Sequence, residues 1–396
     1  METPTKAKRP VSPRREATQG AAVVLSYDKL LNGDDLTAEI ERAYGVDGLG
    51  ILTVEGIPEL SDARSNLLPL AHRFASLSDE KKEKYTIEDA FYAFGWSRGK
   101  EKLDGQFDYS KGSYYNNPQY DRPVDDEELI KKFPSFIHPN IWPSEDVPEL
   151  EAAFKALGQL IVAVGVLVSK QCDSYVKKKC ASYKENYLQQ TIESSLCCKA
   201  RLLHYYPKSF EDNLTPYKRR KVDENEQDRQ REMEQQPDHD PFSSWCGWHN
   251  DHGSLTGLVA AIFTDDDGNI VQNTDPEAGL YIRNRKSEVV KVGIPPTHLA
   301  FQIGETAQIH SGGILQATPH AVRGSSAQGV SRQTFAVFME PNWDEPVQCP
   351  SEISPDDAQS QNAAKNLPKG VPPLHKRWNN SMDFSNFVLA TLAEYH

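Results

Sequence analysis

In the first part of the chain, the spacing of apolar residues alternates between the period of a strand and that of a helix. The apolar run at 21–30 predicts a strand, and the segment 36–48 has helical spacing that ends at a glycine. The run at 48–58 predicts a second strand, and 61–85 predicts a helix that begins at a serine. We therefore expect a mixed α/β region over residues 21–190.

The middle of the chain holds one segment without a period and one long helix. Residues 91–143 are rich in Gly, Pro, Tyr and Asp, which predicts a loop-dominated segment. From Pro148 onward, apolar side chains recur on one face of a helix that is expected to support the following region; they are Leu150, Phe154, Leu157, Ile161, Val164, Val168 and Cys172.

A charged insert follows the RLLHYYP run at 201–207. Between residues 218 and 240 the only apolar side chains are Val222, Met233 and Pro237. Such a stretch cannot offset the entropy of ordering itself by burying apolar surface. We therefore expect a mobile charged insert at 211–240.

Beyond the insert the period shortens to that of strands. Runs rich in apolar or β-branched residues, separated by Gly, Pro, Asp and Asn, stand at 257–263, 279–284, 288–295, 298–304 and 332–340. This pattern is typical of a sandwich or barrel. We expect a mainly β fold with flanking helices, whose β core spans 191–345 and whose C-terminal extension and helix span 346–396.

Composition and charge narrow the function classes. The 396 residues are 38 % hydrophobic and 26 % charged, which predicts one large globular domain or two closely packed ones. The net charge of −13 argues against a nucleic-acid partner and favours a small-molecule substrate. The six cysteines form no CxxC pair, so neither a disulfide framework nor a Cys-rich zinc site is expected.

The sequence contains little that would direct the protein to a membrane or a particular compartment. The amino terminus lacks the apolar core of a signal peptide, and no run suggests a membrane partner, so we expect a cytoplasmic protein with a disordered basic tail over residues 1–20. A nuclear or organelle address is the alternative reading of the basic residues in this tail and of KRRK at 218–221.

The main chemical signal is WHNDHGS at 248–254. On an extended strand alternate side chains share a face, so His249 and Asp251 can point to one spot while Asn250 points away. His252 is then expected outside the ligand set. An imidazole and a carboxylate on one edge, joined by a distant histidine, make a two-His-one-carboxylate triad that leaves open positions on non-haem Fe(II).

The third ligand and a possible carboxylate clamp are sought downstream. His320 stands where an antiparallel partner strand is expected to return, with His298 and His310 as alternatives. The strand period places Arg332 and Thr334 on one face, where a guanidinium and a hydroxyl can grip a carboxylate.

These motifs occur in an order that resembles a known family. HND at 249–251, TPHAVR at 318–323, RQT at 332–334, HYYP at 204–207 and GLGILTVEGIP at 48–58 together resemble the Fe(II)/2-oxoglutarate-dependent dioxygenases, specifically the isopenicillin N synthase-like branch. The resemblance runs from Ala21 to Pro341. It implies a double-stranded β-helix, or jelly roll, framed by helices.

The resemblance also implies roles for individual residues. It makes His249, Asp251 and His320 the catalytic iron ligands, and it assigns the far carboxylate of 2-oxoglutarate to Arg332, Thr334 and Tyr206. The family usually has serine in place of this threonine, and it often has asparagine where His204 stands. The implied reaction consumes 2-oxoglutarate and O2, oxidises a small organic metabolite by hydroxylation, desaturation or ring closure, and releases succinate and CO2.

Two rival functions stay open at this point. One is a same-fold Fe(II) oxidase that does not use 2-oxoglutarate, because the Arg-x-Thr pair can hold a different carboxylate. The other is a non-catalytic ligand-binding member that keeps the fold and loses the iron. The tyrosine-rich stretch 107–118 favours a partly aromatic pocket for a small metabolite, and the residues that are candidates to cover the site are Arg98, Tyr109, Tyr114, Tyr115 and Asn117.

The charged insert is expected to be dispensable for the chemistry. Replacement of residues 218–240 by a short Gly-Ser linker should leave iron binding and substrate-independent 2-oxoglutarate decarboxylation unchanged, because the insert has little apolar surface to pack. Metal content and succinate formation measure the outcome. Collapse of the fold in this variant would contradict the expectation.

Overall fold

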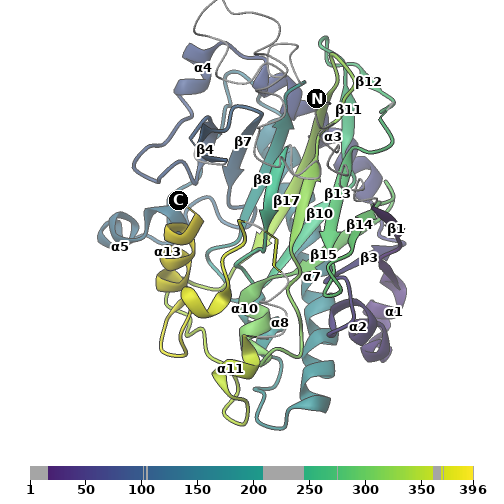
Figure 1. Ribbon diagram of the computed structural model, residues 1–396. Helices are drawn as coiled ribbons and strands as arrows, with labels where there is room; N and C mark the ends of the chain where they lie inside the picture. Colours follow the sequence, from purple (N-terminus) through teal and green to yellow (C-terminus); the bar gives the residue numbers. More distant parts are fainter. Residues whose placement is uncertain are drawn as a thin grey trace, which may run out of the picture.

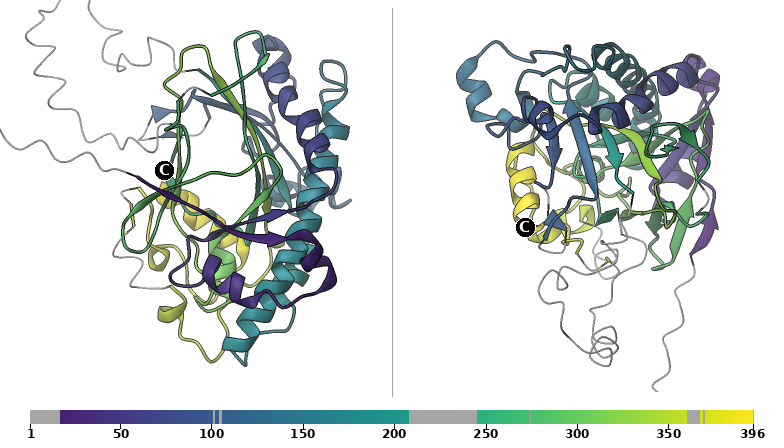
Figure 2. Two further views of the ribbon diagram at one scale, coloured as in Figure 1. Left: turned by 90° about the vertical axis from the view of Figure 1, so that its right-hand side faces the viewer. Right: turned by 90° about the horizontal axis from the view of Figure 1, so that it is seen from above.

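Two β-sheets face each other at the centre of the molecule, with helices outside them (Figure 1, Figure 2). The structure, a computed structural model, describes residues 17–100, 102–103, 106–207, 245–273, 275–359, 367–368 and 370–395. The basic residues of the tail, KRRK at 218–221 and the insert predicted at 211–240 lie outside the described residues.

The larger sheet is built by strands from both halves of the chain. Its strands follow the order β2 (Val23–Ser26), β3 (Ile51–Glu55), β15 (Leu299–Ile303), β10 (Leu255–Val259), β17 (Ser331–Met339), β8 (Lys199–Tyr205), β7 (Lys111–Asn116) and β4 (Gly95–Arg98). β2 runs parallel to β3, and the other neighbours in this order are antiparallel. β17 also pairs with β11 (Ile262–Thr264), which pairs with β12 (Ile270–Val271).

The smaller sheet has the order β1 (Thr18–Gly20), β14 (Val289–Val292), β13 (Gly279–Arg283), β16 (His320–Arg323) and β9 (Cys246–His249). β1 runs parallel to β14, and the other neighbours are antiparallel. β1 corrects the prediction that the disordered tail extends to residue 20. Its sequence, TQG, has no apolar pattern, and its pairing with a distant strand forms it.

An apolar core fills the space between the two sheets. Its members come from both, and they include Ile51, Leu203, Ala300 and Ala336 of the larger sheet and Leu280, Ile282, Val290 and Val322 of the smaller sheet. Along β17 the alternate residues Phe335, Val337 and Met339 join a second core beneath the helices. The inner face of β17 therefore carries Arg332 and Thr334, as its period of two predicts.

Three helices cover the outer face of the larger sheet (Figure 2): α2 (Thr37–Tyr44), α3 (Leu60–Ala75) and α7 (Leu150–Lys179). The face predicted for the long helix is confirmed, because all seven of its apolar residues, from Leu150 to Cys172, are 0 % exposed. By length and composition α7 is apolar enough to cross a membrane, yet half of its apolar window is buried inside the fold.

The remaining short elements surround this framework. They are α1 (Tyr27–Asn32), α4 (Asp79–Glu83), β5 (Lys102–Leu103), β6 (Gln106–Phe107), α5 (Glu127–Lys132), α6 (Pro134–Ile137) and α8 (Tyr187–Glu193). The C-terminal part adds α10 (Glu305–His310), α11 (Pro355–Ala358), η2 (Leu374–Lys376) and α13 (Phe384–Tyr395). Trp378, Phe384 and Phe387 of this part form a separate small core with α5 and α6.

The expectation of a mainly β core with flanking helices is confirmed. The segment 91–143, predicted to be loop-dominated, also contributes strands to the larger sheet. It contains β4 and β7, and β7 pairs with β8 along the larger sheet. The sequence does not predict these strands, because the polar residues Ser97, Lys111 and Ser113 interrupt the alternation of apolar side chains that identifies a strand. The N-terminal region thus contributes strands to the same sheet as the core.

Candidate metal centre and carboxylate site

Three potential metal ligands converge at one end of the space between the sheets. His249 ends β9 and His320 begins β16, and the two residues are direct partners in the ladder. Asp251 follows two residues after His249, so its side chain returns to the same side. Its Oδ1 atom lies 3.6 Å from Nε2 of His249 and 3.7 Å from Nε2 of His320. Among the described residues, this is the one His/Cys/Asp/Glu cluster able to hold a metal, with all ligand atoms within 4.8 Å.

The two imidazoles are oriented by backbone carbonyl groups. Nδ1 of His249 lies 2.8 Å from the carbonyl oxygen of Gly247, and Nδ1 of His320 lies 3.4 Å from that of Thr318. A carbonyl oxygen only accepts hydrogen bonds, so Nδ1 carries the proton in each ring. In the neutral form of each ring, Nε2 therefore has the lone pair that metal coordination requires.

The protonation of the cluster agrees with a cation site. Burial, together with the charge of His249, lowers the pKa of His320 to about 4, so this imidazole is neutral at neutral pH. Burial also lowers the pKa of His249, but Cys246 and Asp251 outweigh it and raise the value to about 9. Burial raises the pKa of Asp251, but the two histidines hold it below its ordinary value. A bound cation takes the place of the His249 proton.

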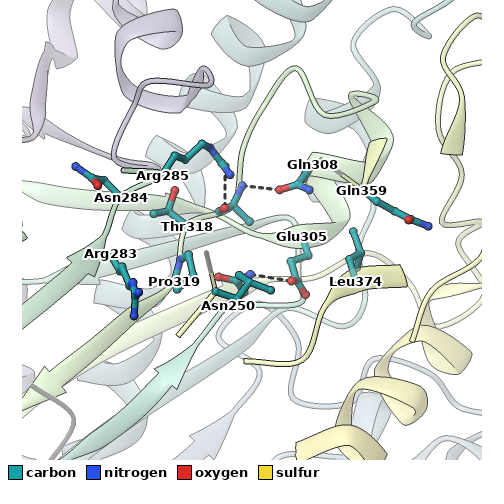
Figure 3. Close-up of a pocket in the computed structure, with 12 residues that line it drawn as sticks. Asn250, Arg283, Asn284, Arg285, Glu305, Gln308, Thr318, Pro319, Gln359 and Leu374 are labelled. Carbon is teal, nitrogen blue, oxygen red and sulfur yellow. Dashed lines mark hydrogen bonds between the residues drawn. The ribbon is translucent and has the colours of Figure 1, made fainter. Parts of the chain in front are cut away.

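The residue between the first two ligands faces the other way. Asn250 donates from Nδ2 to Oε1 of Glu305, at 2.9 Å, and the backbone N–H of Glu305 donates to the carbonyl oxygen of Asp251. Figure 3 shows Asn250 and Glu305 joined in a polar cleft of about 520 Å³. This cleft lies beside the metal loop, because Asn250, Thr318 and Pro319 line it and the three ligands do not.

A buried ion pair ties this loop to the C-terminal part. Arg377 donates from Nη2 to Oε1 of Glu305 and from Nη1 to Oγ1 of Thr391 in α13. The side chains of the ion pair are 0 % and 4 % exposed. Burying two charges is costly, so an intact pair says little about stability, but a broken pair leaves one charge uncompensated.

We expect Arg377→Leu to lower the free energy of unfolding by about 3–5 kcal/mol, because Glu305 then stays buried without its cation. Urea unfolding measures this change. Arg122→Leu is the matched control, since its pairs with Asp125 and Glu127 are exposed and are worth at most about 1 kcal/mol. A loss below about 1 kcal/mol in Arg377→Leu would contradict the expectation.

The other histidines considered as ligands lie elsewhere. Nε2 of His252 lies 3.4 Å from Oε1 of Glu340, on the side away from the cluster. His298 Nδ1 lies 3.2 Å from the Thr53 hydroxyl. His310 ends α10, where it is 2 % exposed and its Nε2 lies 3.0 Å from the carbonyl oxygen of Pro346. It is therefore a packed core residue, outside the ligand cluster.

His310 should make stability depend on pH. Burial lowers its pKa from 6.5 to about 4, so between these values the unfolded chain binds a proton that the folded chain does not. Stability is therefore expected to fall as the pH drops from about 6.5 to about 4, by roughly 3 kcal/mol at most from this residue. Urea unfolding of wild type and His310→Gln should show a smaller loss in the variant. Parallel curves would contradict this assignment.

The carboxylate clamp stands on the inner face of β17. Arg332 lies beside Tyr205, its partner on β8, with its guanidinium 5.1 Å from the tyrosine ring. Its Nη1 atom is buried and has no hydrogen-bond partner in the part of the chain that the structure describes. The Thr334 hydroxyl is buried as well and donates to the carbonyl oxygen of Val259 at 3.2 Å. A buried guanidinium nitrogen without a partner is the feature that an incoming carboxylate satisfies.

Tyr206 is not brought to this clamp. Its ring packs at 4.6 Å from His204, which bonds to Gln333 on the outer face of the larger sheet, and the Arg98 guanidinium lies 3.8 Å above it. Because neighbours on a strand face opposite sides, the tyrosine beside Arg332 is Tyr205. The register of β8 against β17 determines whether Tyr205 or Tyr206 lies beside Arg332, and this register cannot be derived from the HYYP motif alone.

The residues of the tyrosine-rich stretch that were candidates to cover the site lie on different sides of the larger sheet. Tyr114 is buried against Phe74 in the core beneath the helices, and the Asn117 side chain donates to the carbonyl oxygen of Leu196. Tyr109 is 60 % exposed. Tyr115 remains on the inner side, where the Arg201 guanidinium lies 4.9 Å from its ring.

The donor set fits the metal expected from the sequence. Two neutral imidazoles and one carboxylate on one side of an ion leave its other positions open, which is the arrangement of non-haem Fe(II) oxygenases. Of the residues implied by the resemblance, the structure brings His249, Asp251 and His320 together. It places Arg332 and Thr334 together on the inner face of the same enclosure.

Comparison with known proteins agrees with this geometry. Residues 24–145 match the family described as non-haem dioxygenase in morphine synthesis N-terminal. No curated protein is significantly similar in sequence to the chain.

Several solved structures share the fold. A 2OG-Fe(II) oxygenase family protein from Caulobacter crescentus is 19 % identical with a TM-score of 0.60, over 95 % of this chain and 99 % of its own. A full-length Neurospora crassa protein in complex with alpha-KG is 18 % identical with a TM-score of 0.59, over 93 % and 95 %. JOX2 in complex with 2OG, Fe and JA is 19 % identical with a TM-score of 0.57, over 98 % and 90 %. Residues 24–145 are therefore similar to the N-terminal region of the non-haem dioxygenases, and the chain shares its fold with solved 2OG-Fe(II) oxygenases.

Proposed function

We propose that this protein is a non-haem Fe(II)- and 2-oxoglutarate-dependent dioxygenase with a double-stranded β-helix core, acting on a small organic metabolite. The observation that supports this most is the convergence of His249, Asp251 and His320 at one end of an enclosure. The inner wall of this enclosure carries Arg332, whose Nη1 atom has no hydrogen-bond partner among the described residues. The ligand set alone also suits a hydrolase or an oxidase. The carboxylate clamp favours an oxygenase that binds a cosubstrate with a carboxylate group, as 2-oxoglutarate has.

The residues of the chain prepare the site for this reaction. His249, Asp251 and His320 would hold Fe(II), and the carbonyl groups of Gly247 and Thr318 keep both imidazole Nε2 atoms directed to it. Bound iron supplies the oxidising chemistry, in which substrate, 2-oxoglutarate and O2 give oxidised product, succinate and CO2.

The inner wall would bind and orient the cosubstrate. Arg332 would grip the far carboxylate of 2-oxoglutarate with its planar fork, and Thr334 and Tyr205 lie beside it on the same wall. The apolar side chains around them, such as Leu203 and Ile282, exclude water and strengthen this charge pair.

Support for a small substrate comes from the enclosure and from the structural neighbours. The inner wall lies between two sheets whose core positions are filled by apolar side chains, and such an enclosed apolar setting suits a small ligand better than a folded polymer. Solved structures of the Neurospora crassa protein hold thymine or 5-formyluracil, and that of JOX2 holds JA. Hydroxylation, desaturation and ring closure all fit the proposed site.

A metabolite screen tests the proposal. Purified protein with Fe(II), 2-oxoglutarate and ascorbate is offered a library of small molecules, and succinate is read against the background without substrate. A true substrate should raise succinate and give a product heavier by one oxygen or lighter by two hydrogens. Stimulation by oligonucleotides or folded proteins alone would overturn the small-molecule substrate.

A further inference from the structure

The carboxylate ligand lies outside the strands that carry the two histidines. β9 ends at His249 and β10 begins at Leu255, so Asp251 lies in the metal loop, residues 250–254, between them. Segment 304–306 donates a hydrogen bond to each carbonyl oxygen from 251 to 254: the Glu305 N–H to Asp251 at 2.8 Å, the Thr306 hydroxyl to His252 at 2.6 Å, the Thr306 N–H to Gly253 at 3.1 Å and the Gly304 N–H to Ser254 at 3.0 Å. The orientation of Asp251 therefore depends on the position of this segment.

Gly304 brings the two backbones into direct contact. A Cβ atom at this position would overlap the carbonyl oxygen of Gly253 and would lie 3.1 Å from that of Asp251. The close approach therefore requires a residue without a side chain. A shift of segment 304–306 would be transmitted directly to the metal loop.

A side-chain link connects the same loop to the C-terminal part. Asn250 lies between two of the proposed metal ligands in the sequence, and its Nδ2 donates to Oε1 of Glu305 at 2.9 Å (Figure 3). This oxygen also accepts from Nη2 of Arg377 at 2.5 Å. Arg377 is itself fixed, because its Nε donates to the carbonyl oxygen of Pro372 at 3.2 Å and its Nη1 to the hydroxyl of Thr391 at 3.0 Å. One carboxylate oxygen thus joins the metal loop to α13.

The burial of this link makes it directional and strong. The side chains of Arg377 and Glu305 are 0 % and 4 % exposed, so little water competes for their hydrogen bonds. The two histidine ligands face each other in the β9–β16 ladder and are held by it. Asp251 is not in that ladder, so it is the ligand whose position most needs support from outside.

We propose that Glu305 is a positioning residue for the metal centre. It holds Asp251 through its N–H group and through Asn250, and Arg377 fixes its carboxylate. The C-terminal part then sets how tightly the cluster holds a divalent cation, although none of its residues is a ligand. The proposal rests on the proposed function only for the identity of the metal.

Metal titration tests this role without turnover. Metal-free protein is titrated with Co(II), an ion of the same series whose visible spectrum reports its ligands. Asn250→Ala removes the link but keeps the buried Glu305–Arg377 pair, so the variant is expected to fold. Its Kd for Co(II) should rise about 10- to 100-fold, the usual effect of losing a group that orients a metal ligand.

A double-mutant cycle identifies the path. Arg377→Leu should also weaken Co(II) binding, and Arg377→Lys, which keeps the charge, should recover part of the loss. Because both changes act through one oxygen of Glu305, Arg377→Leu should have a much smaller effect in Asn250→Ala than in wild type. If Arg377→Leu does not fold, Asn250→Ala decides alone.

Gln171→Ala is the matched control for a lost buried amide. Gln171 joins α7 to the backbone of Asp34 and Leu36, on the outer side of the larger sheet. Its loss should lower the urea midpoint at least as much as Asn250→Ala does, with the wild-type Kd for Co(II).

Wild-type Co(II) affinity in Asn250→Ala, or equal effects of Arg377→Leu in both backgrounds, would overturn the proposal. An equally large rise of the Kd in Gln171→Ala would show a general effect of stability and would overturn it as well. Failure of the proposed function shows separately, as wild-type protein that binds the metal but forms no succinate from 2-oxoglutarate.

Discussion

His320→Ala is expected to lower Fe(II)-dependent turnover of 2-oxoglutarate by more than about 100-fold, since loss of a group that merely orients a ligand already costs about 10–100-fold. The His320 Nε2 atom lies 3.7 Å from Asp251 Oδ1, and its ring stands 4.2 Å from that of His249. Without it, two ligands remain and the metal is held on one side only. Iron content after anaerobic reconstitution and succinate formation measure the two consequences.

His298→Ala is the matched control for this variant. His298 contacts Thr53 and Glu55 outside the cluster, so its removal should leave iron content and turnover close to those of wild type. Wild-type iron content and activity in His320→Ala would remove this residue from the ligand set. Loss of both in His298→Ala would reopen the choice of third ligand.

Arg332→Leu is expected to raise the apparent KM for 2-oxoglutarate by roughly thirty- to several-thousand-fold, or about 2–5 kcal/mol. The buried Nη1 atom of Arg332 has no hydrogen-bond partner among the described residues, and the proposed carboxylate of the cosubstrate would satisfy it. Removal of the guanidinium leaves that carboxylate without its fork in a water-poor enclosure. Initial rates of succinate formation over a 2-oxoglutarate titration give the value.

Arg323→Leu controls for the loss of a strand arginine near the site. Arg323 ends β16 on the outer side and lies 3.5 Å from Glu277, so the KM for 2-oxoglutarate should not change. An unchanged KM in Arg332→Leu would place the cosubstrate elsewhere. In that case the better interpretation is an Fe(II) oxidase of the same fold that does not use 2-oxoglutarate and whose clamp binds a different carboxylate.

Local sequence signals were sufficient for the ligand strand and the clamp strand. The HxD spacing predicts one shared face for His249 and Asp251, and the structure has that face. The period of two in β17 correctly separates Arg332 from Phe335. The long helix has an uninterrupted apolar face, which explains why all seven of its predicted core residues are buried.

Strands that carry site chemistry were harder to predict. β7 places Lys111 and Ser113 inward, where an ordinary strand has apolar side chains, so the alternation that identifies a strand is missing. β1 has no apolar pattern either and depends on β14 for its hydrogen bonds.

Contacts between residues that are far apart in the sequence could not be predicted from local sequence patterns. The choice of Tyr205 over Tyr206 depends on the register between β8 and β17. The contact of Arg377 with Glu305 spans 72 residues, and only the fold brings this cation to the metal loop. A buried arginine near the C-terminus is a weak signal, since arginines are ordinarily exposed.

The most direct test is the stoichiometry of 2-oxoglutarate consumed and succinate formed by protein that holds one equivalent of Fe(II), in air. We expect equal amounts of the two, formed only when both Fe(II) and O2 are present, and loss of this conversion in His320→Ala. Protein that binds iron through the cluster but leaves 2-oxoglutarate intact, with and without an accepted substrate, would contradict the dioxygenase assignment. Protein that binds no iron would contradict the metal centre itself.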